Sequence, residues 1–254
     1  MKTLTCMAVA MMGLVTLSSC SKNTKLNGDA KIESFTFDTS VEANQIVKSQ
    51  PELSGTAYSF VVYPWADAEA MSKLVPTIVV SQGANYTTNG SYDGQGMTYV
   101  VTSEDKNAST TYTVSAKGSI YNTYAGLLNV TMNGSELATD VPYDIVLQKG
   151  TAAKSVTVFI QNFQLSVLGS VVDLGDVQIP DCPIELTDTG CKFAGTLDLG
   201  NITVPLAGQQ LTVPCVVNVA DATVDMAGNF DLPLAITVAS IMNVDAHFTG
   251  SIKK

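Results

Sequence analysis

The feature that most constrains this chain is the recurrence of short strand signals along its length. From residue 29 onward, segments rich in Val, Ile, Thr, Tyr and Phe are separated by Gly, Asn, Asp or Ser. They recur about every 8–12 residues, a spacing typical of a β-sandwich or a β-barrel, and the β-branched and aromatic content supports strands. The nearest approach to a helical period is residues 66–74, one or two turns before Pro76. The sequence therefore predicts an all-β protein.

Composition sets the size of the core and excludes one class of partner. The 254 residues are 46% apolar and 14% charged, so the chain is not disordered and can build one large domain or two ordinary ones. Acidic residues outnumber basic ones by 23 to 13, and every basic residue is Lys. Arg supplies the fork that grips phosphates and guanine edges, and nucleic-acid binders need a basic stripe. We therefore expect no nucleic-acid partner, and no adhesion to anionic lipid through a basic face.

The N-terminus has the pattern of an export signal. Met1 and Lys2 give a positive start, and an apolar run over residues 4–17 follows. The run is shorter than the roughly 20 residues that a membrane-spanning helix needs, but it fits the apolar region of a secretory signal peptide. No later segment is apolar for about 18 residues without polar breaks. We therefore expect no other segment to hold the chain in a membrane.

The segment Leu17-Ser18-Ser19-Cys20 follows this run directly and resembles the bacterial lipobox, in which small residues precede a cysteine. The resemblance implies that residues 1–19 are removed, that Cys20 carries the lipid and that residues 20–28 form a polar tether. Two or three acyl chains make such an anchor stable. The implied location is the outer membrane, on either its periplasmic or its cell-surface leaflet. An ordinary signal peptide with a chance cysteine is the alternative.

The first predicted domain covers residues 29–117. Its strand signals lie at residues 32–37, 58–63, 77–81, 98–102 and 111–115. The last two signals predict a hairpin turned at residues 104–107, and the unit has the size of a small Ig-like sandwich. Residues 118–122 form a short linker without a Pro-rich stretch, so we expect the two domains to lie close together.

Parts of this first unit resemble the N-terminal Ig-like domain of many Bacteroidota lipoproteins. The similar segments are Ile32-Glu33-Ser34-Phe35, residues 74–84, and the closing residues 99–105 with 111–114. The resemblance implies an Ig-like β-sandwich that acts as a spacer. It implies no reaction.

The second predicted domain covers residues 123–254 and contains eight strand signals. They lie at residues 124–132, 143–148, 155–161, 165–174, 192–199, 211–219, 234–238 and 244–252. Eight strands can close a barrel with either a filled interior or one small ligand cavity. In the last signal Val244, Ala246 and Phe248 alternate with Asp245 and His247, as in a strand with one buried face.

This second unit resembles the calycin-like β-barrel domain at the C-terminus of many Bacteroidota lipoproteins. The similar segments are residues 124–130 with Asn133-Gly134, 154–158 with Asn162-Phe163, 175–180 and 245–250. The resemblance implies an antiparallel, roughly eight-stranded barrel. Lipocalin relatives bind apolar ligands inside such a barrel.

Cys182, Cys191 and Cys215 are the cysteines of the two predicted domains. An exported protein can hold disulfides, and three thiols allow at most one. If Leu186 pairs with Cys191 across the turn at residues 187–190, Cys182 lies about four residues out of register, which argues against a bridge between them. Buried thiols are the alternative, and a metal site would need more ligands at closer spacing.

The sequence contains no motif for catalysis or for a cofactor. His247 is the single histidine, and we expect it to face solvent on the polar side of the last strand rather than to act as a catalytic base or to bind metal. Asp173, Asp176 and Asp181 lack the pattern of a calcium loop, so we expect solvated turn residues. We therefore expect no enzyme, no metal and no cofactor. A hydrolase acting through paired carboxylates is the minor alternative.

Aromatic side chains are the better indication of binding. Trp65 and Tyr92 fall in predicted loops, where aromatic rings stack on sugars or anchor protein contacts. For Trp65, a core position filled by its apolar body is the favoured interpretation. The sequence thus predicts a non-enzymatic binding or accessory lipoprotein for a small apolar ligand, a glycan or a protein partner. The alternative is a structural or assembly component of a cell-surface complex, which a barrel filled by its own side chains would favour.

Overall fold

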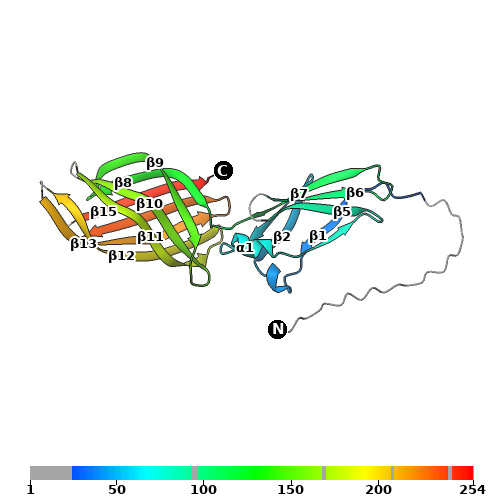
Figure 1. Ribbon diagram of the computed structural model, residues 1–254, viewed down its shortest axis with the longest axis horizontal. Helices are drawn as coiled ribbons and strands as arrows, with labels where there is room; N and C mark the ends of the chain where they lie inside the picture. Colours follow the sequence, from blue (N-terminus) through cyan, green and yellow to red (C-terminus); the bar gives the residue numbers. More distant parts are fainter. Residues whose placement is uncertain (1–24, 93–95, 168–169, 207–208, 240–241, 254) are drawn as a thin grey trace, which may run out of the picture.

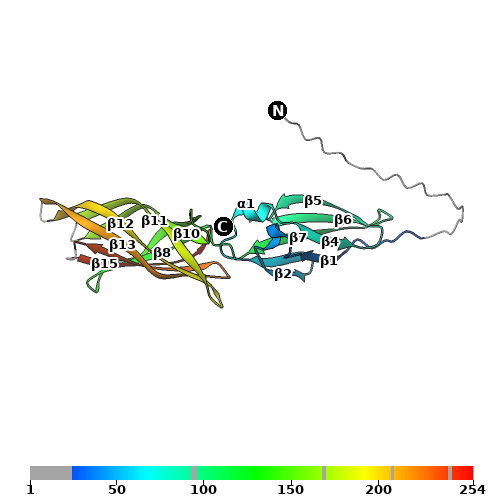
Figure 2. The same cartoon turned by 90° about the horizontal axis from the view of Figure 1, so that it is seen from below.

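A computed structural model describes residues 25–92, 96–167, 170–206, 209–239 and 242–253. The predicted signal peptide and Cys20 lie outside the described residues. Two β-rich bodies follow one another along the long axis (Figure 1), and both views show the strands running roughly along this axis (Figure 2). The predicted all-β class is confirmed.

The N-terminal unit consists of two sheets. The smaller sheet pairs β1 (Ile32–Phe37) with β4 (Pro76–Val80). The larger has the order β2-β3-β7-β6-β5, built from β2 (Val47–Ser54), β3 (Ala57–Val62), β7 (Ser109–Lys117), β6 (Gly96–Thr102) and β5 (Asn85–Ser91). The pair β3–β7 is parallel, whereas the other pairs are antiparallel. Two sheets facing one another confirm the predicted sandwich.

Aromatic side chains from both sheets fill the space between them. Phe35 and Phe37 of β1 meet Tyr58 and Phe60 of β3, with ring centroids 5.2 Å apart for Phe35–Tyr58 and 4.7 Å for Phe37–Phe60. These residues occupy alternate positions, so the period of two puts them on one face of each strand. The unit also has a 3-10 turn η1 (Glu42–Asn44) and the helix α1 (Ala68–Ser72), which falls in the short helical pattern of residues 66–74.

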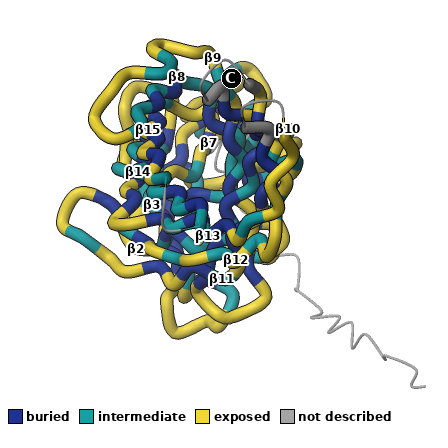
Figure 3. The backbone as a smooth tube through the Cα atoms, turned by 90° about the vertical axis from the view of Figure 1, so that its left-hand side faces the viewer, coloured by how far each residue is buried: buried dark blue, intermediate teal, exposed yellow. Residues whose placement is uncertain are grey.

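The C-terminal unit is a closed barrel with the strand order β10-β11-β12-β13-β14-β15-β8-β9. All of its strand pairs are antiparallel. The strands are β8 (Thr123–Met132), β9 (Ser135–Lys149), β10 (Ser155–Val167), β11 (Ser170–Leu186), β12 (Gly190–Leu206), β13 (Gln209–Asp225), β14 (Asn229–Val238) and β15 (Met242–Ile252). Buried segments line the inside of this body and exposed loops its outside (Figure 3). The predicted eight-stranded barrel is confirmed.

One predicted strand is wrong. Residues 165–174 read as a single strand, but β10 ends at Val167 and β11 begins at Ser170, so the signal spans a hairpin. Valine and leucine occur on both sides of this hairpin, so periodicity could not separate the two strands. At the opposite end of the barrel, Leu186 pairs with Cys191 across the next turn, which is the register that the argument against a Cys182–Cys191 bridge assumed.

A short sequence repeat bends two neighbouring barrel strands. Asp173-Leu174-Gly175 in β11 and Asp198-Leu199-Gly200 in β12 each precede four residues that alternate polar and apolar, and then a proline. Each glycine has a positive φ, 65° and 67°, and donates its N–H to the aspartate two residues earlier at 2.8 Å. Both sit where the strand register shifts. Such bulges turn a strand around the barrel wall.

Candidate functional site

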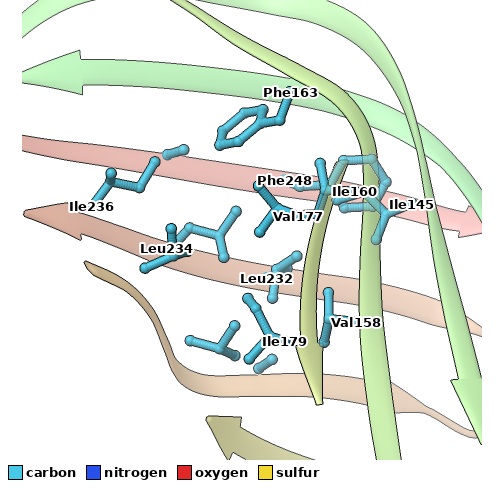
Figure 4. Packing of buried hydrophobic residues seen from close by; sticks show 14 of the residues in the cluster. Ile145, Val158, Ile160, Phe163, Val177, Ile179, Leu232, Leu234, Ile236 and Phe248 are labelled. Atoms are coloured by element: carbon cyan, nitrogen blue, oxygen red, sulfur yellow. The ribbon is translucent and has the colours of Figure 1, made fainter. Parts of the chain in front are cut away.

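The middle of the barrel is filled by its own side chains. Figure 4 shows inward-pointing residues from opposite walls packed together. Nine of the ten labelled residues are exposed by no more than 1%: Ile145, Val158, Ile160, Phe163, Val177, Ile179, Leu232, Ile236 and Phe248. A void large enough for a ligand would leave accessible surface on the side chains that line it. This part of the barrel therefore holds no ligand-sized cavity, and a binding site must lie elsewhere.

Trp65 closes the end of the barrel nearest the N-terminal unit. It is half-buried and packs against the hydrophobic cluster of the barrel, although it belongs to the N-terminal unit. Its ring stacks on Tyr63 with centroids 4.8 Å apart and planes 2° apart. The ammonium of Lys154 lies 4.5 Å from the centre of the Trp65 ring, a cation–π contact. Trp65 is thus a contact between the two units.

Polar contacts reinforce this junction. The carboxylate of Asp67 forms an ion pair with Lys149, and the N–H of Ala70 donates to it at 2.7 Å. Burial pulls the pKa of Asp67 upward, but Lys149 and Ala70 outweigh that effect and hold the pKa below its usual range. The hydroxyl of Tyr121 in the linker donates to the carbonyl of Ser155 at 2.9 Å. Burial raises the pKa of Tyr121 to about 12, so the hydroxyl keeps the proton that it donates.

Asp181 fastens the loop that carries Lys154. Its carboxylate accepts hydrogen bonds from the hydroxyl of Thr151 at 2.6 Å, the N–H of Ala152 at 2.9 Å and the hydroxyl of Ser155 at 2.9 Å. These bonds, with the Ala152 N–H first, lower the pKa of Asp181 to about 2. The carboxylate therefore stabilises the loop that places Lys154 against Trp65. The sequence suggested a loosely solvated turn residue, but three hydrogen bonds hold this carboxylate in place.

Tyr92 belongs to the N-terminal core. Its side chain is only 3% exposed, and its hydroxyl oxygen lies 2.5 Å from that of Tyr99. Burial, together with the Tyr99 hydroxyl, raises the pKa of Tyr92 far above its usual range. The ring borders the junction, but little of its surface is available to a ligand. Ligand contact by Trp65 and Tyr92 stays a prediction, and the structure does not place the two rings against one another.

A hollow of about 470 Å³ lies where the two units meet, which is within the usual range for ligand sites. Val62, Ala68 and Met71 line it from the N-terminal unit. Tyr121 and Asn122 line it from the linker, and Met226 comes from the turn between β13 and β14. The wall combines apolar side chains with a few hydrogen-bonding groups and two charged residues, Lys117 and Asp225, a mixture found in small-molecule sites. Tyr92, which the sequence suggested as a ligand contact, also lines the hollow. No sequence pattern pointed to the other residues named, because they come from three distant segments.

A second hollow, of about 700 Å³, lies on the outer wall of the barrel. Hydroxyl groups of Thr187, Thr223 and Thr249 line it. His247 is close by and faces solvent, with its Nε2 3.1 Å from each oxygen of Asp231. Half of each side chain of this pair is exposed, 52% for His247 and 51% for Asp231. The hollow is wide and open to solvent, unlike the concave sites that bury most of a ligand.

The cysteines of the barrel form no disulfide. Cys182, Cys191 and Cys215 are free and buried. Burial raises the pKa of Cys182 and of Cys191 to about 11, so both are neutral thiols at physiological pH. They act as small apolar residues of the barrel core.

The other acidic residues considered at the sequence level have structural partners. The N–H of Asn162 donates to Asp176 at 2.9 Å, and Asp173 holds the bulge at Gly175. In the part of the chain that the structure describes, no three His, Cys, Asp or Glu side chains come together in a way that could hold a metal ion. Over the same residues, no helix combines the length and the apolar character needed to cross a bilayer.

The fold thus defines an all-β protein with an N-terminal sandwich and a C-terminal closed barrel of eight antiparallel strands. No family model and no curated protein matches the chain. Among solved structures, the chain is similar to a crystal structure from Bacteroides thetaiotaomicron described as a "putative glycoside hydrolase". The two share 13% identity and a TM-score of 0.29, over 91% of this chain and 95% of the other. A similarity that weak says nothing about the activity of this chain.

Proposed function

We propose that this chain is a lipid-anchored, non-enzymatic binding module of the outer membrane whose ligand binds in the hollow between its two units. The hollow at the junction carries this proposal, because it has the volume of a ligand site whereas the middle of the barrel is filled by its own side chains. Ligand sites occur preferentially at domain interfaces. The apolar wall around Met71 and Met226, with Tyr121 and Asn122 as hydrogen-bonding groups, suits a small molecule with an apolar face and hydroxyl or amide groups.

Filling the hollow is the test of binding. Ala68 is exposed and lines the hollow, so Ala68→Trp should occupy it without disturbing a core. The probes are a panel of oligosaccharides and a panel of fatty acids, read by thermal unfolding. A ligand at 100 times its Kd should stabilise the wild type by about 2.7 kcal/mol, and Ala68→Trp should weaken binding at least tenfold, by about 1.4 kcal/mol.

Ala194→Trp is the matched control, since Ala194 is exposed on β12, away from the hollow. It should bind like the wild type. Equal binding by both tryptophan variants would place the ligand outside the hollow. No stabilisation by either panel would contradict this ligand class.

The anchor has its own test at Cys20. We expect the full-length wild type to fractionate with membranes and Cys20→Ala to appear in the soluble fraction, because the thiol is the acyl acceptor and the acyl chains hold the protein. Cys215→Ala removes a thiol from the barrel core and should leave the fractionation unchanged. Wild type and Cys20→Ala that fractionate alike would contradict lipid anchoring through this residue.

One observation favours a second function. A barrel packed with its own side chains is what a structural or assembly component of a surface complex would need. On that view the N-terminal unit acts as a spacer and the barrel as a rigid body. Absence of binding by the panels together with stable recovery of the chain in a larger membrane complex would support this second function.

A further inference from the structure

The two edges of the five-stranded sheet differ in how they are protected. At one edge, β2 carries Lys48, Pro51 and Glu52, and its register against β3 shifts twice. Charges, proline and irregular register are the means by which proteins prevent pairing with another chain. At the other edge, β5 (Asn85–Ser91) contains no charged residue and no proline, and pairs with β6 without a register shift. The chain thus has one protected edge and one open edge.

The open edge is accessible on both of its faces. All residues from Asn85 to Gly90 are exposed, and β5 is the terminal strand of its sheet (Figure 2). Even Tyr86, on the face that looks toward the smaller sheet, remains 44% exposed, with its ring 5.9 Å from that of Tyr99. Between Tyr86 and Gly90, β6 is the single strand neighbour among the described residues, so alternate backbone groups point away from the sheet.

We propose that β5 pairs antiparallel with β5 of a second copy of this chain, about a two-fold axis at Thr88. In this register Thr88 of one copy faces Thr88 of the other, and Thr87 faces Asn89 of the second copy. Tyr86 faces Gly90 of the second copy, where no side chain competes with the ring, an arrangement that favours aromatic residues across from glycine. Each cross-strand pair is neutral, so no like charges are opposed although each chain has a formal net charge of −10.

A second copy suits this edge better than an unrelated strand. The segment is complementary to itself, as the commonest type of oligomer interface requires. The barrel follows the N-terminal unit along the direction of its strands (Figures 1 and 2), so antiparallel pairing directs the two barrels away from one another and they do not collide. Pairing of single edges buries less than the roughly 1,000 Å² of a stable interface. The dimer should therefore be weak and dependent on concentration.

A cysteine at the proposed axis tests the pairing. Directly opposed residues of antiparallel strands have Cα atoms about 4.5–5.5 Å apart, which is within the range for a disulfide. The full-length Thr88→Cys variant should therefore form a reducible dimer under mild oxidation. Among the native cysteines, Cys182, Cys191 and Cys215 are buried and should not contribute, and Cys6 and Cys20 are replaced by alanine in every variant of this test. Thr113→Cys is the matched control, because Thr113 is exposed on β7, which has a strand on both sides.

A second pair of variants avoids cysteine altogether. Thr88→Lys places two ammonium groups against one another at the axis, so the dimer population in sedimentation should fall at least tenfold, with the melting temperature unchanged. Thr113→Lys should leave the dimer population unchanged. The proposal is overturned if Thr88→Cys cross-links no more than Thr113→Cys, or if the wild type stays monomeric at high concentration. Dimers that survive Thr88→Lys would also overturn it.

Discussion

Replacing Phe248 by alanine is expected to lower the free energy of unfolding by about 3–5 kcal/mol, the usual cost of removing a buried aromatic ring. Phe248 is fully buried in the barrel, with its ring centroid 5.6 Å from that of Phe230. The ring lies over two glycines. A Cβ added at Gly126 would come within 2.7 Å of Phe248 Cζ, and one at Gly250 within 2.5 Å of the same atom. The ring of Phe248 occupies the space that side chains at these two glycines would fill. Removing the ring therefore creates a cavity that the strands cannot close.

Denaturant unfolding of the full-length protein measures this loss. Leu127→Ala is the control, since Leu127 lies on a strand next to that of Phe248 but is 41% exposed on the outer wall. Surface changes of this kind stay within about 0.5 kcal/mol. A loss below about 1 kcal/mol for Phe248→Ala would mean that the barrel can collapse around the missing ring, and it would contradict a densely filled interior.

Replacing Trp65 by alanine is expected to cost about 2–3 kcal/mol. A fully buried tryptophan costs about 3–5 kcal/mol, and Trp65 is half-buried. Part of the loss comes from the stacked ring of Tyr63 and from the Lys154 ammonium, contacts worth about 0.5–1.5 kcal/mol each. The change also uncovers the end of the barrel, because Trp65 packs against the barrel cluster from the N-terminal unit.

Trp65→Phe distinguishes the contribution of the aromatic face from that of the other contacts that Trp65 makes at the junction. It keeps an aromatic face for Tyr63 and Lys154 and should lose less than half of what alanine loses. Trp65 is the one tryptophan of the chain, so its fluorescence in the wild type reports the junction directly. We expect that fluorescence to change together with circular dichroism during unfolding. A fluorescence change well before the loss of β-structure would show that the two units separate while each stays folded.

The barrel strands could be predicted because one buried face leaves a period of two in the sequence. Val244, Ala246 and Phe248 are buried, and Asp245 and His247 are exposed, as the alternation in β15 indicated. The edge strands β2 and β5 were missed for the opposite reason. Their residues are mostly exposed on both faces, so no hydrophobic alternation marks them.

The candidate site was largely beyond sequence reasoning. The sequence favoured a core position for Trp65, but it gave no sign that the core in question is that of the barrel. Met71, Tyr121 and Met226 line one hollow although they are far apart in the chain. The sequence around each of them does not indicate that they come together. The short linker at residues 118–122 was the one usable signal, because it keeps the two units close together.

The sequence alone determined the all-β class, most of the strands that close the barrel, and the mismatch that argued against a disulfide between Cys182 and Cys191. These properties depend on local periodicity and on register, which neighbouring residues specify. Only the tertiary structure decided that the middle of the barrel is filled and that a hollow lies at the junction. Apolar residues point inward in both a filled and a hollow barrel. Whether they meet depends on strand tilt, bulges and closure, which are properties of all eight strands together.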